Sequence, residues 1–174
     1  MSASDLPSVY GGRELHVHLD ENDDDIEAID PADARRFLGG NGFAAQAVHD
    51  HVPADADPFD PENVVAFTVG PMNGTPFQST SRGVVGFVSP QTNGFFDSTF
   101  GGTFPRAQKT TGFESVVLHG VADELSYVHV DADGARVVPA SDLAGLGTYE
   151  TCAEVAELAA EEAANDVHVI APGP

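Results

Sequence analysis

The stretch that most constrains the fold is residues 70–112, which read GPMNGTPFQSTSRGVVGFVSPQTNGFFDSTFGGTFPRAQKTTG. Glycine, proline and asparagine gather near its start, at residues 89–94 and at residues 101–105, and they predict turns at these places. The apolar run at residues 83–88 predicts a buried strand between the first two turns. The glycine pair Gly101–Gly102 predicts a turn that leads into a short helix.

The same stretch carries a local excess of positive charge. Arg82, Arg106 and Lys109 fall within residues 82–109, where Asp97 is the only acid, although the whole chain has 28 Asp and Glu against 7 Lys and Arg. An anionic ligand is repelled least there. Converging amides at Gly101–Gly102 and a helix N-terminus suit a phosphate, with Arg82 or Lys109 donating to it. The alternative is a tight turn with basic residues at the surface, because no complete nucleotide-binding motif is present.

The length and the net charge of the chain limit the classes of protein to which it can belong. We expect one domain over residues 1–174, with residues 1–12 loosely ordered. A net charge of −21 argues against nonspecific binding to nucleic acid or to an anionic membrane. Lys109 is the only lysine, which indicates a salt-rich cytoplasm, where about 1 M salt shortens the screening length to roughly 3 Å. An ordinary acidic protein is the alternative.

Cys152 is the only cysteine, so the chain by itself holds neither a disulfide nor an iron–sulfur cluster. The polar start, residues 1–10, has no apolar core of a signal peptide, and no apolar run reaches the length of a membrane span. We therefore expect a cytoplasmic protein. Cys152 is interpreted as a packed thiol; the alternative is a reactive thiol at a helix N-terminus.

Strands outnumber helices along the chain and do not alternate with them, which favours an α+β fold with mixed or antiparallel sheets and a few short helices. We expect helices after Asp30, which suits an N-cap, at residues 42–51 after a cap at Asn41, and from a capping box at residues 151–154 to about residue 164. The turn at residues 131–134 predicts a hairpin. The expected strands are residues 14–19, 64–69, 83–88, 115–118, 125–130, 135–138 and 167–170.

Histidines recur at two places in the first third of the chain. Alternation at residues 14–19 puts Leu15, Val17 and Leu19 on the buried face and His16 and His18 on the other, a spacing that can bind metal. Because no third ligand is near in the sequence, we expect both to face solvent, before an acidic hairpin loop at residues 20–25. His49 and His51 suit a helix C-terminus.

The order of motifs resembles the N-terminal domain of aldehyde ferredoxin oxidoreductases over nearly the whole chain. The motifs that carry this resemblance are residues 37–45 (FLGGNGFAA), 57–63 (DPFDPEN), 70–75 (GPMNGT), Ser81–Arg82, 89–92 (SPQT), Gly101–Gly102, Lys109, 112–120 (GFESVVLHG) and 170–174 (IAPGP). Each motif is modest, but their order and spacing together are specific.

The resemblance implies a cofactor, a tungsten or molybdenum bis-pterin with a magnesium ion that bridges the two pterin phosphates. Arg82 matches the family's pterin-phosphate arginine, and Gly101 and Gly102 match its close-approach glycines. Thr99 stands where the family usually has an asparagine, whose backbone carbonyl touches the magnesium, and Lys109 is a further candidate for seating the cofactor. Asn41 replaces a usual arginine, and Asn93 replaces a usual glycine.

The resemblance also implies a role and partners. We expect a cofactor-binding domain, with no catalytic residue of its own and inactive alone, of an enzyme that oxidises aldehydes to carboxylates. The [4Fe-4S] cluster, the substrate channel and the transfer of electrons to ferredoxin belong to later domains or to a separate chain with the cluster cysteines, and a homodimer is a further possibility. The alternatives are a non-catalytic split or decayed module that binds pterin or another anion, and an enzyme that depends on Cys152.

Overall fold

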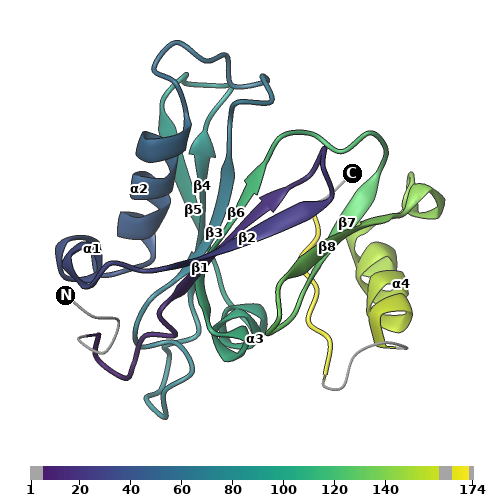
Figure 1. The fold of residues 1–174 in the computed structure, drawn as a ribbon. Coiled ribbons are helices and arrows are strands. Elements are labelled where there is room, and N and C mark those ends of the chain that lie inside the picture. The colour runs from purple at the N-terminus through teal and green to yellow at the C-terminus, as the bar shows by residue number, and fades with distance from the viewer. Residues whose placement is uncertain (1–5, 161–165, 173–174) are drawn as a thin grey trace.

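A six-stranded mixed sheet forms the centre of the molecule in the computed structural model, which describes residues 6–160 and 166–172 (Figure 1). The strand order is β2-β1-β6-β3-β4-β5, in which β1 and β6 pair in parallel and the other neighbours are antiparallel. The strands are β1 (Arg13–His18), β2 (Asp23–Ala28), β3 (Val65–Val69), β4 (Gly83–Val88), β5 (Phe95–Phe100) and β6 (Phe113–His119).

Four α-helices and a separate hairpin surround this sheet. They are α1 (Pro31–Phe37), α2 (Asn41–His51), α3 (Phe104–Thr111), α4 (Thr148–Ala160), and the strands β7 (Ser126–Val130) and β8 (Ala135–Pro139); the short 3-10 helix η2 spans Ser141–Leu143. Figure 1 shows α2 on one side of the sheet and the β7–β8 hairpin with α4 on the other side. The expected α+β fold is confirmed.

The core is divided between the two faces of the sheet. Ala47 and Val48 of α2 pack on Val64, Ala66 and Val117. On the opposite face the β7–β8 hairpin covers a second cluster, made by Leu15, Val17, Phe113, Val116 and Val137. Because successive residues of a strand point to opposite faces, β1 sends Leu15 and Val17 to the hairpin and His16 to the side of α2.

Several local predictions are confirmed. Residues 83–88 form β4, and the side chain of Asp30 accepts a hydrogen bond from the Ala32 amide at the start of α1. At the hairpin turn, the side chain of Asp131 accepts from the amides of Asp133 and Gly134. These signals are short in range, so the sequence alone is enough to identify them.

Other local predictions are wrong, each for a physical reason. Helix α4 begins at Thr148 and not at residue 151, because Glu150 accepts a hydrogen bond from the Gly147 amide in the manner of a capping box. The side chain of Asn41 does not cap α2 but donates to Asp97 instead. Residues 23–25 belong to β2, residues 166–172 form no strand, and β5 was not expected.

Two further expectations concern the N-terminus and the histidines. The loose order expected at residues 1–12 falls partly on residues 1–5, outside the described chain, whereas the Tyr10 hydroxyl donates to the Leu38 carbonyl at 2.9 Å. The expected end of the last helix, residues 161–164, also lies outside the described residues. His16 is buried, with 6% of its surface exposed, so its predicted position in solvent is wrong.

Candidate functional site

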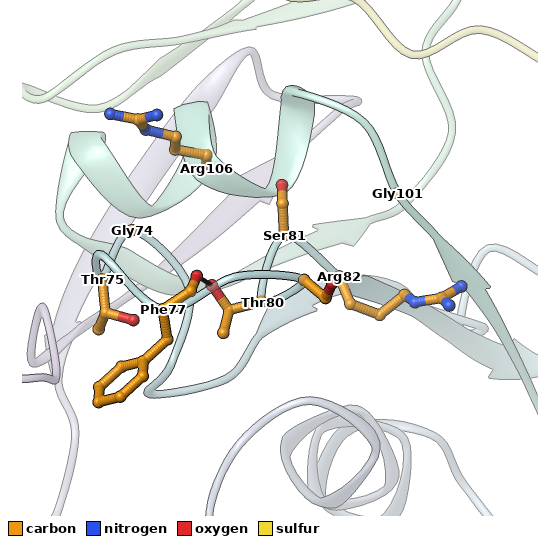
Figure 2. A pocket seen from close by; sticks show the side chains of 9 residues that line it. Gly74, Thr75, Phe77, Thr80, Ser81, Arg82, Gly101 and Arg106 are labelled. Atoms are coloured by element: carbon orange, nitrogen blue, oxygen red, sulfur yellow. Dashed lines mark hydrogen bonds between the residues drawn. The ribbon is translucent and has the colours of Figure 1, made fainter.

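A pocket of about 450 Å³ lies between the loop before β4 and the start of α3 (Figure 2). It lies within the stretch that the sequence marks as locally positive. Its lining residues are Gly74, Thr75, Phe77, Ser79, Thr80, Ser81, Arg82, Gly101 and Arg106.

Buried Asn73 fixes the backbone at Arg82. Its side-chain amide donates to the Arg82 carbonyl at 2.9 Å, and its side-chain oxygen accepts from the Arg82 amide at 3.1 Å. The Arg82 side chain is exposed and extends away from these backbone contacts, and it donates a hydrogen bond to the Thr99 hydroxyl at 3.4 Å. Asn73 was not expected to be a site residue, because an asparagine beside a glycine is typical of a turn.

The glycine pair follows the end of β5, and the first of its two residues belongs to the pocket wall. Gly101 lines the pocket, and the Gly102 carbonyl accepts a hydrogen bond from the Ser81 hydroxyl. Gly102 has a φ of +82°, and a Cβ on it would meet no heavy atom within 4 Å. The backbone there is therefore open to a ligand, while the positive φ favours glycine.

Two cations stand at this site without an acidic partner. Within residues 6–160 and 166–172, neither Arg82 nor Arg106 forms an ion pair. Figure 2 shows the two guanidinium groups on different sides of the loop, pointing away from each other. Guanidinium groups without a carboxylate partner can donate paired, charge-assisted hydrogen bonds to phosphate oxygens, so each of the two arginines can bind a separate phosphate group at the edge of the pocket.

Lys109 is engaged elsewhere. Its ammonium forms an ion pair with the fully buried Glu114, which also accepts from the Gly11 amide, and it lies 5.7 Å from the centre of the Tyr10 ring. Its Cγ would contact a Cβ on Gly74, at 3.2 Å, so the lysine stem lies under one wall of the pocket. Of the expected site residues, Arg82 and Gly101 line the pocket, together with Arg106, which was not expected there. Thr99 and Gly102 do not line it, but each accepts a hydrogen bond from a lining residue, Arg82 and Ser81 respectively.

The sequence of the chain identifies its family. Residues 14–174 match the family described as aldehyde ferredoxin oxidoreductase, N-terminal domain. The chain belongs to this family.

One curated relative is similar over nearly the whole chain, and another over about half of it. The chain is 30% identical to the tungsten-containing aldehyde ferredoxin oxidoreductase of Thermococcus kodakarensis over 168 residues, which is 95% of this chain and 27% of that protein. It is 35% identical to the glyceraldehyde-3-phosphate:ferredoxin oxidoreductase of Pyrococcus furiosus over 83 residues, 48% of this chain and 13% of that protein. The chain therefore spans about a quarter of the length of the first of these relatives.

A solved structure supports the fold. The active-site complex BamBC of benzoyl coenzyme A reductase, in complex with 1,5-dienoyl-CoA, matches with a TM-score of 0.84 and 33% identity, over 88% of this chain and 24% of that one. The same domain thus occurs in more than one kind of oxidoreductase. Among the residues described here, no helix is both long and apolar enough to cross a membrane.

Proposed function

We propose that this chain is the domain on which a tungsten or molybdenum bis-pterin rests in an aldehyde ferredoxin oxidoreductase-like enzyme. The observation that carries the proposal is that the guanidinium groups of Arg82 and Arg106 form no ion pair with any described residue and lie near the open backbone at Gly101 and Gly102. This donor set suits the phosphate groups of a pterin cofactor. When bound, the cofactor supplies two-electron redox chemistry, with which the complete enzyme oxidises an aldehyde to a carboxylate and reduces ferredoxin.

The residues of the chain bind and orient the cofactor. Arg82 donates to a phosphate and is held for this by Asn73. The backbone at Gly101 and Gly102 allows close approach, and the carbonyl of Thr99 is the proposed contact to a bridging magnesium ion. Lys109 acts as a positioning residue, because its pair with Glu114 joins α3 to β6 below the pocket.

The remaining parts of the function lie outside the described residues. We propose that the cluster cysteines, the substrate channel and the ferredoxin contact come from other domains or from a separate chain, and that the chain works in a salt-rich cytoplasm. The alternative is a non-catalytic module that binds an anion, which Asn41 favours: in place of the family's usual arginine, it donates to Asp97 at 2.6 Å and adds no positive charge.

The test is the cofactor content of the chain, purified in high salt from cells supplied with tungstate and molybdate, together with any subunit that co-purifies. Arg82→Ala should lose most of the bound metal and pterin, while Arg35→Ala, which removes an exposed arginine of α1, should keep them. Metal analysis and pterin fluorescence give the two contents. Equal contents in both variants would refute the role of Arg82. A wild-type chain that binds inorganic phosphate but never pterin would support the alternative.

A further inference from the structure

Four histidines from three separate segments meet on the side of the sheet that carries α2. His16 and His18 lie on β1, His119 lies opposite His18 on the parallel strand β6, and His51 is the last residue of α2. Their rings form a contiguous group: His16 and His51 are 5.0 Å apart between centroids, His51 and His119 5.0 Å, and His18 and His119 5.1 Å.

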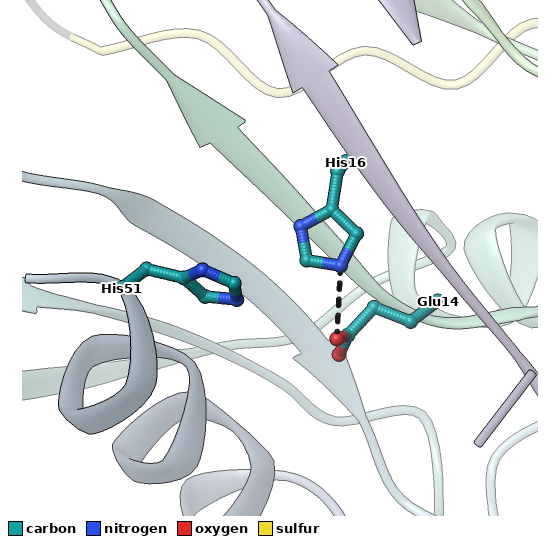
Figure 3. Close-up of side chains that lie close together, drawn as sticks. All are labelled: Glu14, His16 and His51. Atoms are coloured by element: carbon teal, nitrogen blue, oxygen red, sulfur yellow. Dashed lines mark ion pairs between the residues drawn. The ribbon is translucent and has the colours of Figure 1, made fainter. Parts of the chain in front are cut away.

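The nitrogen atoms of His16 face two partners. Its Nε2 is 3.2 Å from a carboxylate oxygen of Glu14, which lies two residues earlier on the same face of β1, and its Nδ1 is 2.9 Å from Nε2 of His119 (Figure 3 shows the Glu14 contact). His51 reaches toward this pair from the end of α2. One ligand atom from each of Glu14, His16 and His51 lies within 4.8 Å of the others.

The titratable side chains around the histidine group are carboxylates and other imidazoles. Across β2, Asp25 pairs in register with His16, and His18 forms an ion pair with Asp25 at 3.4 Å. Among the described residues, no lysine or arginine forms an ion pair with these acids. A neutral imidazole carries one lone pair, which can accept a hydrogen bond or bind a metal ion.

We propose that Glu14, His16 and His51 bind one divalent transition metal ion, with zinc as the first choice. A carboxylate oxygen, Nε2 of His16 and a ring nitrogen of His51 are the ligands. His119 accepts the hydrogen bond of Nδ1–H of His16 and so orients that ring, as the second partner of a metal-bound histidine commonly does. This site shares no residue with the pocket in Figure 2.

Ligand type and spacing both select this class of ion. Imidazole nitrogen suits zinc, copper, iron and nickel, whereas calcium and magnesium prefer oxygen ligands throughout. Two ligands bound at about 2.0–2.1 Å to a tetrahedral zinc lie roughly 3.3 Å apart, close to the 3.2 Å between Glu14 and His16. Three protein ligands leave a fourth position for water or a further group. Because His51 is exposed, an ion can reach the site from solvent.

The competing interpretation is a hydrogen-bond network without metal. Although burial opposes it, the hydrogen bond and charge of Glu14 raise the pKa of His16, and a protonated His16 can donate to Glu14 and His119 at once. A proton and a metal ion would then compete for the same centre. Stoichiometric metal binding distinguishes the two interpretations.

The test is a zinc titration of the full chain after chelator treatment, in a high-salt buffer that screens its acidic surface, with competition against a chelator of known affinity. We expect one equivalent of zinc, and tetrahedral visible absorption when Co²⁺ replaces it. His51→Ala and Glu14→Gln should each weaken binding at least about tenfold. His49→Ala removes an exposed histidine two residues away on the same helix and should bind as the wild type does.

His51 lies at the exposed end of a helix and Gln has the shape of Glu, so we expect both variants to keep their fold, which circular dichroism checks. Unchanged affinity in either variant, or the absence of a stoichiometric site in the wild type, would overturn the proposal. An equal loss in His49→Ala would show diffuse binding to surface histidines and would also overturn it. Arg82→Ala should leave zinc binding unchanged, so this result is independent of the cofactor proposal.

Discussion

The two ends of helix α2 lie beside two regions of opposite chemistry. At its start, Asn41 donates to Asp97 on β5, the strand whose Thr99 accepts from Arg82. At its end, His51 joins Glu14, His16 and His119. The helix has 11 residues, so about 16 Å separates its two ends. One region offers arginines to an anion, and the other offers imidazoles and carboxylates to a cation.

The regions also differ in how the sequence encodes them. The pocket is built within residues 74–106, so its glycines and arginines are visible as one local pattern. The histidine group comes from residues 14–18, 51 and 119, which only the β1–β6 pairing and the end of α2 bring together. A cluster of residues that are close in the chain is thus visible in a single sequence, whereas a cluster made by tertiary pairing is not.

Replacing Lys109 should have the largest effect. Unlike Arg82 and Arg106, this cation of the positive stretch already has an acidic partner, Glu114. Lys109→Ala would leave the fully buried Glu114 charged and unpaired, and we expect a loss of about 3–5 kcal/mol in the free energy of unfolding. Denaturant unfolding in high salt measures it. Arg106→Ala, one turn earlier and exposed, should cost less than about 0.5 kcal/mol.

A double variant separates lost charge balance from lost packing at this position. Lys109→Met with Glu114→Gln removes both charges and keeps an acceptor for the Gly11 amide. It should recover most of the stability lost in Lys109→Ala. If the double variant is as unstable as the single one, the buried pair does not explain the loss, and Lys109 would return to consideration as a direct ligand of the cofactor.

The contrast between local and long-range contacts also explains which predictions from the sequence were right. Asp30 at the start of α1 and the turn at residues 131–134 were identified because their partners lie within three residues. Strand β5 was missed because four of its six residues are exposed and its pattern is weak, so its pairing with β4 defines it. His16 was misplaced because the alternation in β1 shows which residues share a face but not what covers that face.

Zinc gives the next largest expected effect and tests whether the two regions act independently. A ligand at a free concentration 100 times its dissociation constant stabilises the folded state by about 2.7 kcal/mol. We therefore expect zinc at that excess to raise the melting temperature of the wild type and of Arg82→Ala alike. His51→Ala should show little of this rise. Equal stabilisation of all three proteins would place the bound zinc elsewhere.

Gly86 tests the contact between α2 and the sheet, about one turn from the start of the helix. A Cβ on Gly86 would lie 2.8 Å from the Cβ of Ala44, so Gly86→Ala forces α2 away from β4. We expect a loss of about 1–3 kcal/mol in the free energy of unfolding, with weaker binding of phosphate near the start of α2 and of zinc at its end. Gly94→Ala is the matched control, since its Cβ would meet only the Thr92 hydroxyl, at 4.0 Å. If only phosphate binding or only zinc binding weakens, the position of α2 does not control both sites.

Replacing Asn41 has the smallest expected effect, and this effect is confined to the region at the start of α2. Its side chain is exposed and makes one hydrogen bond to Asp97, so Asn41→Ala should cost no more than about 1 kcal/mol of stability. Asp97 and Thr99 share one face of β5, two residues apart, so release of Asp97 frees a carboxylate on the strand that Arg82 contacts. A nearby carboxylate competes with an anion for the guanidinium, and we expect a few-fold loss of phosphate affinity with zinc affinity unchanged. Asn41→Ala with Asp97→Asn removes that competitor and should restore phosphate binding; if it does not, the Asn41 side chain itself contacts the anion.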